Sequence, residues 1–219
     1  MGVLVLSLGK DGTFQLINSN YNSIADQFFK YFTHYGDGIM WLPLGLFCFF
    51  YRRKYFIAVL AGVLISTIIA QFLKRVVYPD ELRPITYLSD AFPVHQIAGV
   101  EMRRVHSFPS GHTTTAFTMA LLMAYMINKK TWSIILPLLA TLAGYSRVYL
   151  AQHFPTDVLA GMCIGILSAI LSLLVYRKFI RYINKKPASQ TEAALRWGRD
   201  STLSSEALAK EGLKLNVYF

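Results

Sequence analysis

Two uninterrupted apolar runs limit what this chain can fold into more than any other feature of its sequence. Residues 55–73 and residues 158–176 are each 19 residues long and hold no charged side chain. A helix needs about 20 apolar residues to cross the hydrocarbon core of a bilayer. A soluble fold of 219 residues has too little polar surface to hide two such runs beside further apolar segments. The sequence therefore predicts an integral membrane protein.

Three shorter apolar runs extend this pattern to an all-α membrane bundle. We expect about five transmembrane helices, at about residues 37–52, 55–75, 108–128, 131–149 and 156–178. The apolar residues among positions 20–36 recur at helical spacing between polar ones, which predicts an N-terminal amphipathic helix at the membrane interface. A long loop joins the second span to the third. The domain embedded in the membrane then covers residues 1–186, and residues 187–219 form a polar C-terminal tail.

Clusters of Lys and Arg indicate which loops lie in the cytoplasm. Residues 52–54 and residues 129–130 separate consecutive spans, and five more basic residues follow the last span within residues 177–186. With five spans these clusters share one face, which holds ten Lys and Arg against eight on the other face. Basic loops stay in the cytoplasm, so we expect the N-terminus outside and the C-terminus inside.

The composition excludes several other classes of protein. The net charge of +10 accompanies a hydrophobic content of 54%, which fits membrane topology signals and anionic substrates, and we expect no nucleic-acid partner. Such an apolar chain is not disordered over most of its length. The only two cysteines, Cys48 and Cys163, lie in apolar runs and exclude a disulfide scaffold. The sequence does not specify an oligomeric state.

Polar residues that can carry chemistry adjoin the spans on the non-cytoplasmic face. They are Lys74 after the second span, Arg83-Pro84 in the long loop, Pro109-Ser110-Gly111-His112 before the third span, Ser146-Arg147 at the end of the fourth, and His153 with Asp157 before the fifth. The three cations Lys74, Arg83 and Arg147 can together neutralise a phosphate and the charge that spreads over its oxygens during transfer.

Proline marks the start of the third predicted span. Pro109 suits the first turn of a helix, because it lacks the N–H that would be unpaired there. The backbone N–H groups of Ser110, Gly111 and His112 would then be free to bind an anion, and Gly111 would let a phosphate approach closely.

The fifth predicted span begins in the same way at Pro155. This start places Asp157 in the first helical turn and His153 just before it. Asp157 can accept a hydrogen bond from one ring nitrogen of His153 and leave the other nitrogen with a free lone pair. Two histidines, one of them oriented by a carboxylate, are what a nucleophile and a general acid require.

The sequence predicts no metal site and no cofactor. His106 and His112 are six positions apart without partner cysteines, which is a poor pattern for zinc. We expect His34, His95 and His106 to be solvated residues at the membrane interface.

These residues carry a resemblance to a known family. The chain resembles the type-2 phosphatidic acid phosphatase superfamily of integral-membrane lipid phosphatases over about residues 37–183. The family's Pro-Ser-Gly-His signature matches residues 109–112, and its Ser-Arg-x5-His-x3-Asp signature matches residues 146–157 with every spacing kept. Its Lys-x6-Arg-Pro signature is altered, because eight residues separate Lys74 from Arg83. Arg75, separated from Arg83 by seven residues, is the alternative cation.

The resemblance implies a role for each matching residue. His153 would attack phosphorus and become a transient phosphohistidine, and Asp157 would orient it. His112 would protonate the leaving oxygen and then activate water. The residues that would hold the phosphate are Lys74, Arg83, Ser110, Gly111 and Arg147.

The predicted function is a metal-independent membrane lipid phosphatase. Its site would face the periplasmic or extracytoplasmic side of a bacterial inner membrane. Candidate substrates are an isoprenyl diphosphate such as undecaprenyl diphosphate, phosphatidylglycerophosphate, phosphatidate and a phosphate of lipid A, and the motifs do not distinguish among them. One alternative is a lipid phosphotransferase with the same site. Others are a transporter of anions or lipids without hydrolysis, and a vanadate-dependent haloperoxidase, against which the spans argue.

Overall fold

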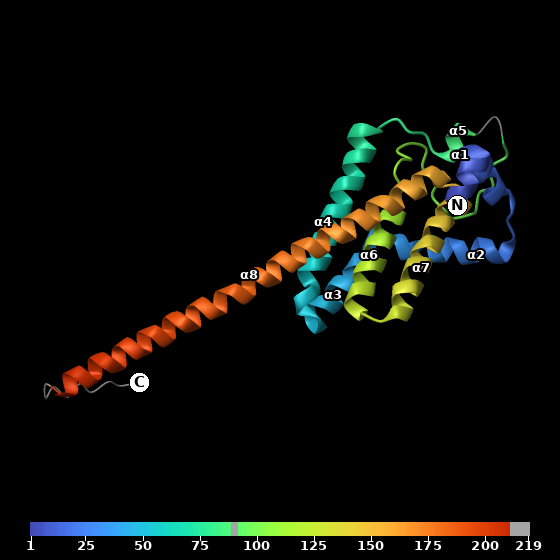
Figure 1. The fold of residues 1–219 in the computed structure, drawn as a ribbon. Coiled ribbons are helices and arrows are strands. Elements are labelled where there is room, and N and C mark those ends of the chain that lie inside the picture. The colour runs from blue at the N-terminus through green and yellow to red at the C-terminus, as the bar shows by residue number, and fades with distance from the viewer. Residues whose placement is uncertain (89–91, 211–219) are drawn as a thin grey trace. The chain divides into compact units, whose positions relative to one another are not determined.

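Every regular element in the described part of the chain is a helix (Figure 1). The computed structural model describes residues 1–88 and 92–210, with side chains described through residue 183. Contacts divide the chain into a first unit, Met1–Tyr176, and a second unit that begins at Arg177. No strand occurs within the described residues, which confirms the all-α prediction.

The first unit contains most of the helices. In chain order the helices are α1 (Gly2–Ser19), α2 (Ser23–Phe32), the 3-10 turns η1 (Thr33–Gly36) and η2 (Gly38–Met40), α3 (Trp41–Tyr51), α4 (Arg53–Phe72), the π-helical turn η3 (Leu73–Val77), α5 (Pro84–Tyr87), α6 (Gly111–Ile127), α7 (Lys130–Tyr149) and α8 (Pro155–Lys210). Helix α8 continues into the second unit, and residues 187–210 of the predicted tail are helical. Residues 211–219 of that tail lie outside the described residues.

Each of the five predicted spans contains a helix. Two segments, Arg53–Val77 and Pro155–Ile183, are long and apolar enough to cross a membrane, and Gly38–Tyr51 is a shorter apolar helix. Helix α6 has 17 residues, and α7 carries Arg147 in its last turn. The spanning role of the three other segments stays a prediction.

Small residues let the central helices approach closely. Helices α6 and α7 share a core that includes Ala116, Ala120 and Ala143. Gly161 brings α8 against α6, since a Cβ there would lie 2.6 Å from the carbonyl oxygen of Ser110. Small side chains at helix contacts are the usual means of packing helices in membranes.

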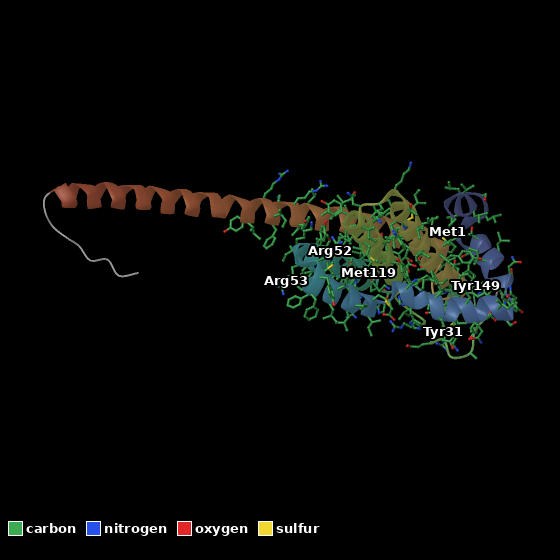
Figure 2. The ribbon with its side chains drawn as sticks, turned by 90° about the horizontal axis from the view of Figure 1, so that it is seen from below. Met1, Tyr31, Arg52, Arg53, Met119 and Tyr149 are labelled. Atoms are coloured by element: carbon green, nitrogen blue, oxygen red, sulfur yellow. The ribbon has the colours of Figure 1, made fainter. Side chains whose placement is uncertain are left out.

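The hairpins of the bundle place the loops at opposite ends. In Figure 1 the α3–α4 and α6–α7 connections lie at one end, and the α4–α6 and α7–α8 connections lie at the other. Figure 2 looks at the molecule from below and shows Arg52 and Arg53 on the opposite side of Met119 from Tyr149 and Tyr31. The residues singled out for chemistry therefore gather at one end, away from two of the three basic clusters.

The predicted amphipathic helix is present, and part of its apolar face packs on the bundle. Helix α2 begins after Asn22, whose side chain accepts a hydrogen bond from the Ala25 N–H at 2.9 Å. The ring of Phe29 lies 4.6 Å from that of Tyr149 on α7, while Ile24 and Phe28 remain exposed. The position of α2 at a membrane interface stays a prediction.

Helix α1 is an element that the sequence pattern did not predict. It bends at Gly9, whose φ of 71° lies in the region that favours glycine. Phe14 is fully buried, and its ring meets that of Phe154 edge to face at 5.6 Å. The second half of α1 thus supports the connection between α7 and α8.

We expect Phe14→Ala to destabilise the bundle. The substitution would leave a cavity beside Phe154, and loss of a buried Phe side chain costs about 3 kcal/mol or more of unfolding free energy. Thermal unfolding in detergent should show a clearly lower Tm. Val3→Ala serves as the control in the same helix, because Val3 is 79% exposed. Equal Tm values for the two variants would contradict the buttressing role of α1.

Candidate active site

A cavity of about 650 Å³ is lined by residues 30–38 near the N-terminus and by residues of the three signatures. Six of the eight predicted site residues line it: Lys74, Arg83, Gly111, His112, Arg147 and His153. The other two, Ser110 and Asp157, are buried and bonded to residues beside them. The fold therefore brings together motifs that extend over 84 positions of the sequence.

Lys74, and not Arg75, is the basic residue of its helix end that lines the cavity. The Arg75 Nε instead donates to the Gln71 side chain, one turn earlier, at 3.0 Å. Both residues lie in the π-helical turn η3, which fits one extra residue into the helix. This turn accommodates part of the longer spacing between Lys74 and Arg83.

His153 is held in a buried and neutral state. Its ring Nδ1 lies 3.4 Å from the Asp157 Oδ2, a long contact for a hydrogen bond, and its side chain is 2% exposed. Burial lowers the pKa of His153 well below its ordinary value, and the nearby charges of Arg83, Lys74 and Arg147 lower it further. A neutral imidazole has a free lone pair on one nitrogen, as a nucleophile requires.

Asp157 is fixed by more partners than His153 alone. Its Oδ2 accepts hydrogen bonds from the Ser107 hydroxyl at 2.5 Å and from the Phe154 N–H at 3.0 Å. Its backbone carbonyl accepts from the Ser110 N–H at 3.0 Å. These bonds join the end of the long loop, the start of α6 and the start of α8 around one residue, Asp157.

The start of α6 differs from the predicted one by two residues. Ser110 caps the helix, because its hydroxyl accepts from the Thr113 N–H at 3.4 Å, and Gly111 is the first helical residue. Pro109 therefore lies outside the helix, and the Ser110 N–H is already bonded to Asp157. The N–H groups of Gly111 and His112 remain at the helix start, and a Cβ added at Gly111 would meet open space. An anion can approach this helix end.

Arg83 crosslinks the long loop to the connection before α8. Its Nη1 donates to the Gln152 carbonyl at 2.7 Å and its Nε to the Val105 carbonyl at 3.1 Å. Burial and the neighbouring charge of Arg103 lower the pKa of Arg83 to about 10, so the guanidinium is still charged at neutral pH.

Arg147 is positioned by a residue that the sequence motifs do not include. The Thr33 hydroxyl of η1 accepts a hydrogen bond from the Arg147 Nη1 at 2.7 Å. The Arg147 Nε is buried and has no hydrogen-bond partner among the described residues. A bound anion can satisfy this donor.

Other residues of the site also escaped the sequence analysis. Asp37 and Lys30 line the cavity although no motif marks them, and Gln152 and Ser107 hold Arg83 and Asp157. Of these four residues, only Gln152 could be suspected from the sequence, because it directly precedes His153.

One expectation about the remaining histidines is wrong. His95 is not a solvated interface residue: its Nε2 lies 3.1 Å from the Asp26 Oδ1, and its ring stacks on Tyr21 at 3.7 Å. The hydroxyl of Tyr149 donates to the same Asp26 oxygen at 2.6 Å. The chain brings these partners together from three separate segments, which the local pattern does not indicate. His34 and His106 are exposed, as expected.

Groups of His, Cys, Asp and Glu that could bind a metal ion do not occur among the described residues. What the cavity offers instead is fixed positive charge, helix-end N–H groups and two imidazoles. Such an arrangement can bind a tetrahedral oxyanion and transfer its central atom to a nitrogen.

Comparisons of the sequence and of the structure with known proteins match the same family. A model of the PAP2 superfamily matches residues 54–181. Undecaprenyl-diphosphatase BcrC of Bacillus subtilis (strain 168) is 28% identical over 190 residues, which are 78% of this chain and 93% of that protein. The crystal structure of LpxE from Aquifex aeolicus aligns with a TM-score of 0.66 and 34% identity, over 74% of this chain and 92% of that one. The first transmembrane PAP2 type phosphatidylglycerolphosphate phosphatase from Bacillus subtilis aligns with a TM-score of 0.61 and 25% identity, over 81% of this chain and 90% of that one.

We expect the His153 imidazole to stay neutral when an exposed histidine becomes charged. An unperturbed imidazole titrates near pH 6.5, and burial keeps His153 unprotonated well below that pH. NMR of histidine-labelled protein in detergent should show no His153 titration between about pH 8 and pH 6. A His153→Asn sample assigns the resonance. A His153 midpoint between about pH 8 and pH 6 would contradict the buried, neutral state.

Proposed function

Because the chain belongs to the PAP2 superfamily and is a lipid phosphatase, we propose that it removes phosphate from a membrane lipid through a phosphohistidine on His153. The observation that carries this proposal is the single cavity lined by His153, His112 and three buried or half-buried cations. A transporter would need a path through the bundle, whereas this cavity pairs a neutral, carboxylate-bound imidazole with an anion site.

The phosphate binds where the cations and the start of α6 converge. Lys74, Arg83 and Arg147 neutralise its oxygens, and the Arg147 Nε gains a partner on binding. The N–H groups at Gly111 and His112 add hydrogen bonds, while Ser110 fixes the helix end through its cap. Charge that builds up on these oxygens in the transition state meets groups that are already in place.

His153 attacks phosphorus with the ring nitrogen that faces the cavity. Asp157 accepts the hydrogen bond from Nδ1, which leaves Nε2 with the lone pair and stabilises the positive charge that develops on the ring. A bond forms between Nε2 and phosphorus as the ester bond breaks. The electron pair of that bond leaves with the lipid oxygen, and His112, which is protonated in the complex with the phosphate anion, gives this oxygen its proton.

The second step releases phosphate. His112, now neutral, takes a proton from a water molecule as the water oxygen attacks the phosphohistidine. The bond between phosphorus and Nε2 breaks, its electrons return to His153, and inorganic phosphate leaves. Microscopic reversibility gives His112 the role of acid first and base second. Since the protein's own cations supply the positive charge, added metal is unnecessary in this mechanism.

The membrane arrangement that we propose has five spans and an extracytoplasmic site. Basic clusters at residues 52–54 and 129–130 lie at the end of the bundle remote from the cavity (Figure 1). Basic loops favour the cytoplasm, which directs the cavity to the periplasmic face of a bacterial inner membrane. A site at helix ends meets a lipid headgroup while the tail stays in the bilayer.

We expect His153→Asn to abolish phosphoenzyme formation. Rapid acid-sensitive, base-stable labelling by a lipid with radioactive terminal phosphate should appear in the wild type and be absent from the variant. Phosphate release in detergent should fall at least about a thousandfold, because the nucleophile is lost, and EDTA should leave the wild-type rate unchanged. His106→Asn is the matched control: His106 is exposed, and Asn tolerates its positive φ of 58°. Labelling of His153→Asn, or inactivation of the wild type by EDTA, would refute the mechanism.

The orientation predicts which engineered cysteines can be labelled from outside. In a background without Cys48 and Cys163, we expect Arg104→Cys to react with an impermeant maleimide in intact spheroplasts. Lys129→Cys should react only after the membrane is opened, because it lies in a basic cytoplasmic loop. The reverse labelling pattern would place the site in the cytoplasm.

A further inference from the structure

Two cations line the cavity beyond the three that the signatures explain. They are Lys30, in the last turn of helix α2, and Arg103, which lies in the long loop. Lys30 precedes the residues matched by the PAP2 model, and neither residue belongs to a family signature. Three cations already suffice for one phosphate, so two further cations need their own explanation, even though Asp37 and Glu101 line the same cavity.

The backbone around Arg103 is fixed while its side chain is free to bind. The Gln152 side chain donates to the carbonyl of Glu101 at 2.9 Å, and the Arg83 N–H donates to the carbonyl of Arg104 at 2.9 Å. These bonds hold the chain on both sides of Arg103 against the residues next to His153. The Arg103 side chain is 66% exposed and has a loose contact, 3.6 Å, with Glu101. Because the backbone is already fixed, binding of an anion here orders only the Arg103 side chain.

Lys30 is also held at the cavity from outside the signatures. Its Nζ donates to the Ala98 carbonyl at 2.6 Å. The adjoining loop residue Gly99 has a φ of +80°, a backbone conformation that favours glycine. An ammonium group has three N–H donors, and this contact occupies one of them.

Two cations of the signatures are buried more deeply than the two additional cations. Arg83 and Arg147 are 4% and 8% exposed and lie near the buried His153, whereas Lys30 is half-buried and Arg103 is exposed. A phosphate under attack by His153 sits at the deep group. Lys30 and Arg103 line the same cavity, so a group attached to that phosphate can reach them.

On the basis of the phosphatase function proposed above, we propose that Lys30 and Arg103 bind a second phosphate joined directly to the one removed, so that the preferred substrate is a lipid diphosphate. The bond from His153 to the terminal phosphorus forms as the bond from that phosphorus to the bridging oxygen breaks. The bridging oxygen takes the electron pair and the proton from His112, and the lipid monophosphate leaves. This leaving group is an anion, which the shallow cations stabilise, whereas a monoester releases a neutral alcohol that does not need them.

The test compares two lipids that differ by one phosphate. Diacylglycerol diphosphate and phosphatidate share an anchor, and phosphatidylglycerophosphate adds a second phosphate separated by glycerol. We expect Lys30→Met and Arg103→Gln each to lower kcat/KM for the diphosphate about tenfold in mixed micelles, as expected for one charge-assisted contact. The rate with phosphatidate should change less than about twofold, which also shows that each variant is folded. Lys30→Arg should keep most of the preference.

Arg104→Gln is the matched control, because Arg104 is exposed and its side chain does not line the cavity. Equal losses on diphosphate and phosphatidate, or no loss on either, would overturn the roles of Lys30 and Arg103 and leave the phosphatase function intact. A selective loss on phosphatidylglycerophosphate alone would overturn the directly joined diphosphate. A wild type that releases phosphate from none of the three lipids would instead contradict the proposed function itself.

Discussion

The mutual repulsion of buried cations is the constraint on which the site is built. Lys74, Arg83 and Arg147 surround one cavity, and each loses hydration by being there. Backbone carbonyls and hydroxyls compensate only in part: Arg83 donates to Gln152 and Val105, and Arg147 donates to Thr33. The positive charge that remains uncompensated favours the binding of an anion. A bound phosphate accepts hydrogen bonds from the free N–H donors and also reduces the repulsion among the three cations.

The same constraint explains why so many separate segments meet at this end of the bundle. Asp157 is held by Ser107 and Phe154, and its carbonyl holds Ser110, so that the starts of α6 and α8 cannot move independently. Polar groups buried near a membrane are costly unless they are paired. Each bond that positions a reactive group therefore also joins two elements of the fold, which keeps the geometry rigid before substrate arrives.

The N-terminal elements complete a site whose core comes from the matched family region. Thr33 orients Arg147, Lys30 and Asp37 line the cavity, and Gly36 packs so closely on His112 that a Cβ would lie 2.7 Å from its carbonyl oxygen. Helix α1 supports the other side through Phe14 and Phe154. Residues before position 54 thus line part of the cavity although they precede the range that the family model matches.

The sequence by itself determined the helical class and two segments long and apolar enough to span a membrane, and it predicted the residues of the site. Long apolar runs leave few alternatives to membrane helices, and signatures with fixed spacing name their residues without a fold. Only the tertiary structure decided that Lys74 and not Arg75 lines the cavity, that α6 begins at Gly111 and not at Pro109, and that His95 is paired. It also decided the partners Thr33, Gln152 and Ser107. These features depend on contacts between residues as much as 114 positions apart. A local sequence pattern does not specify which distant side chain will lie within hydrogen-bonding distance.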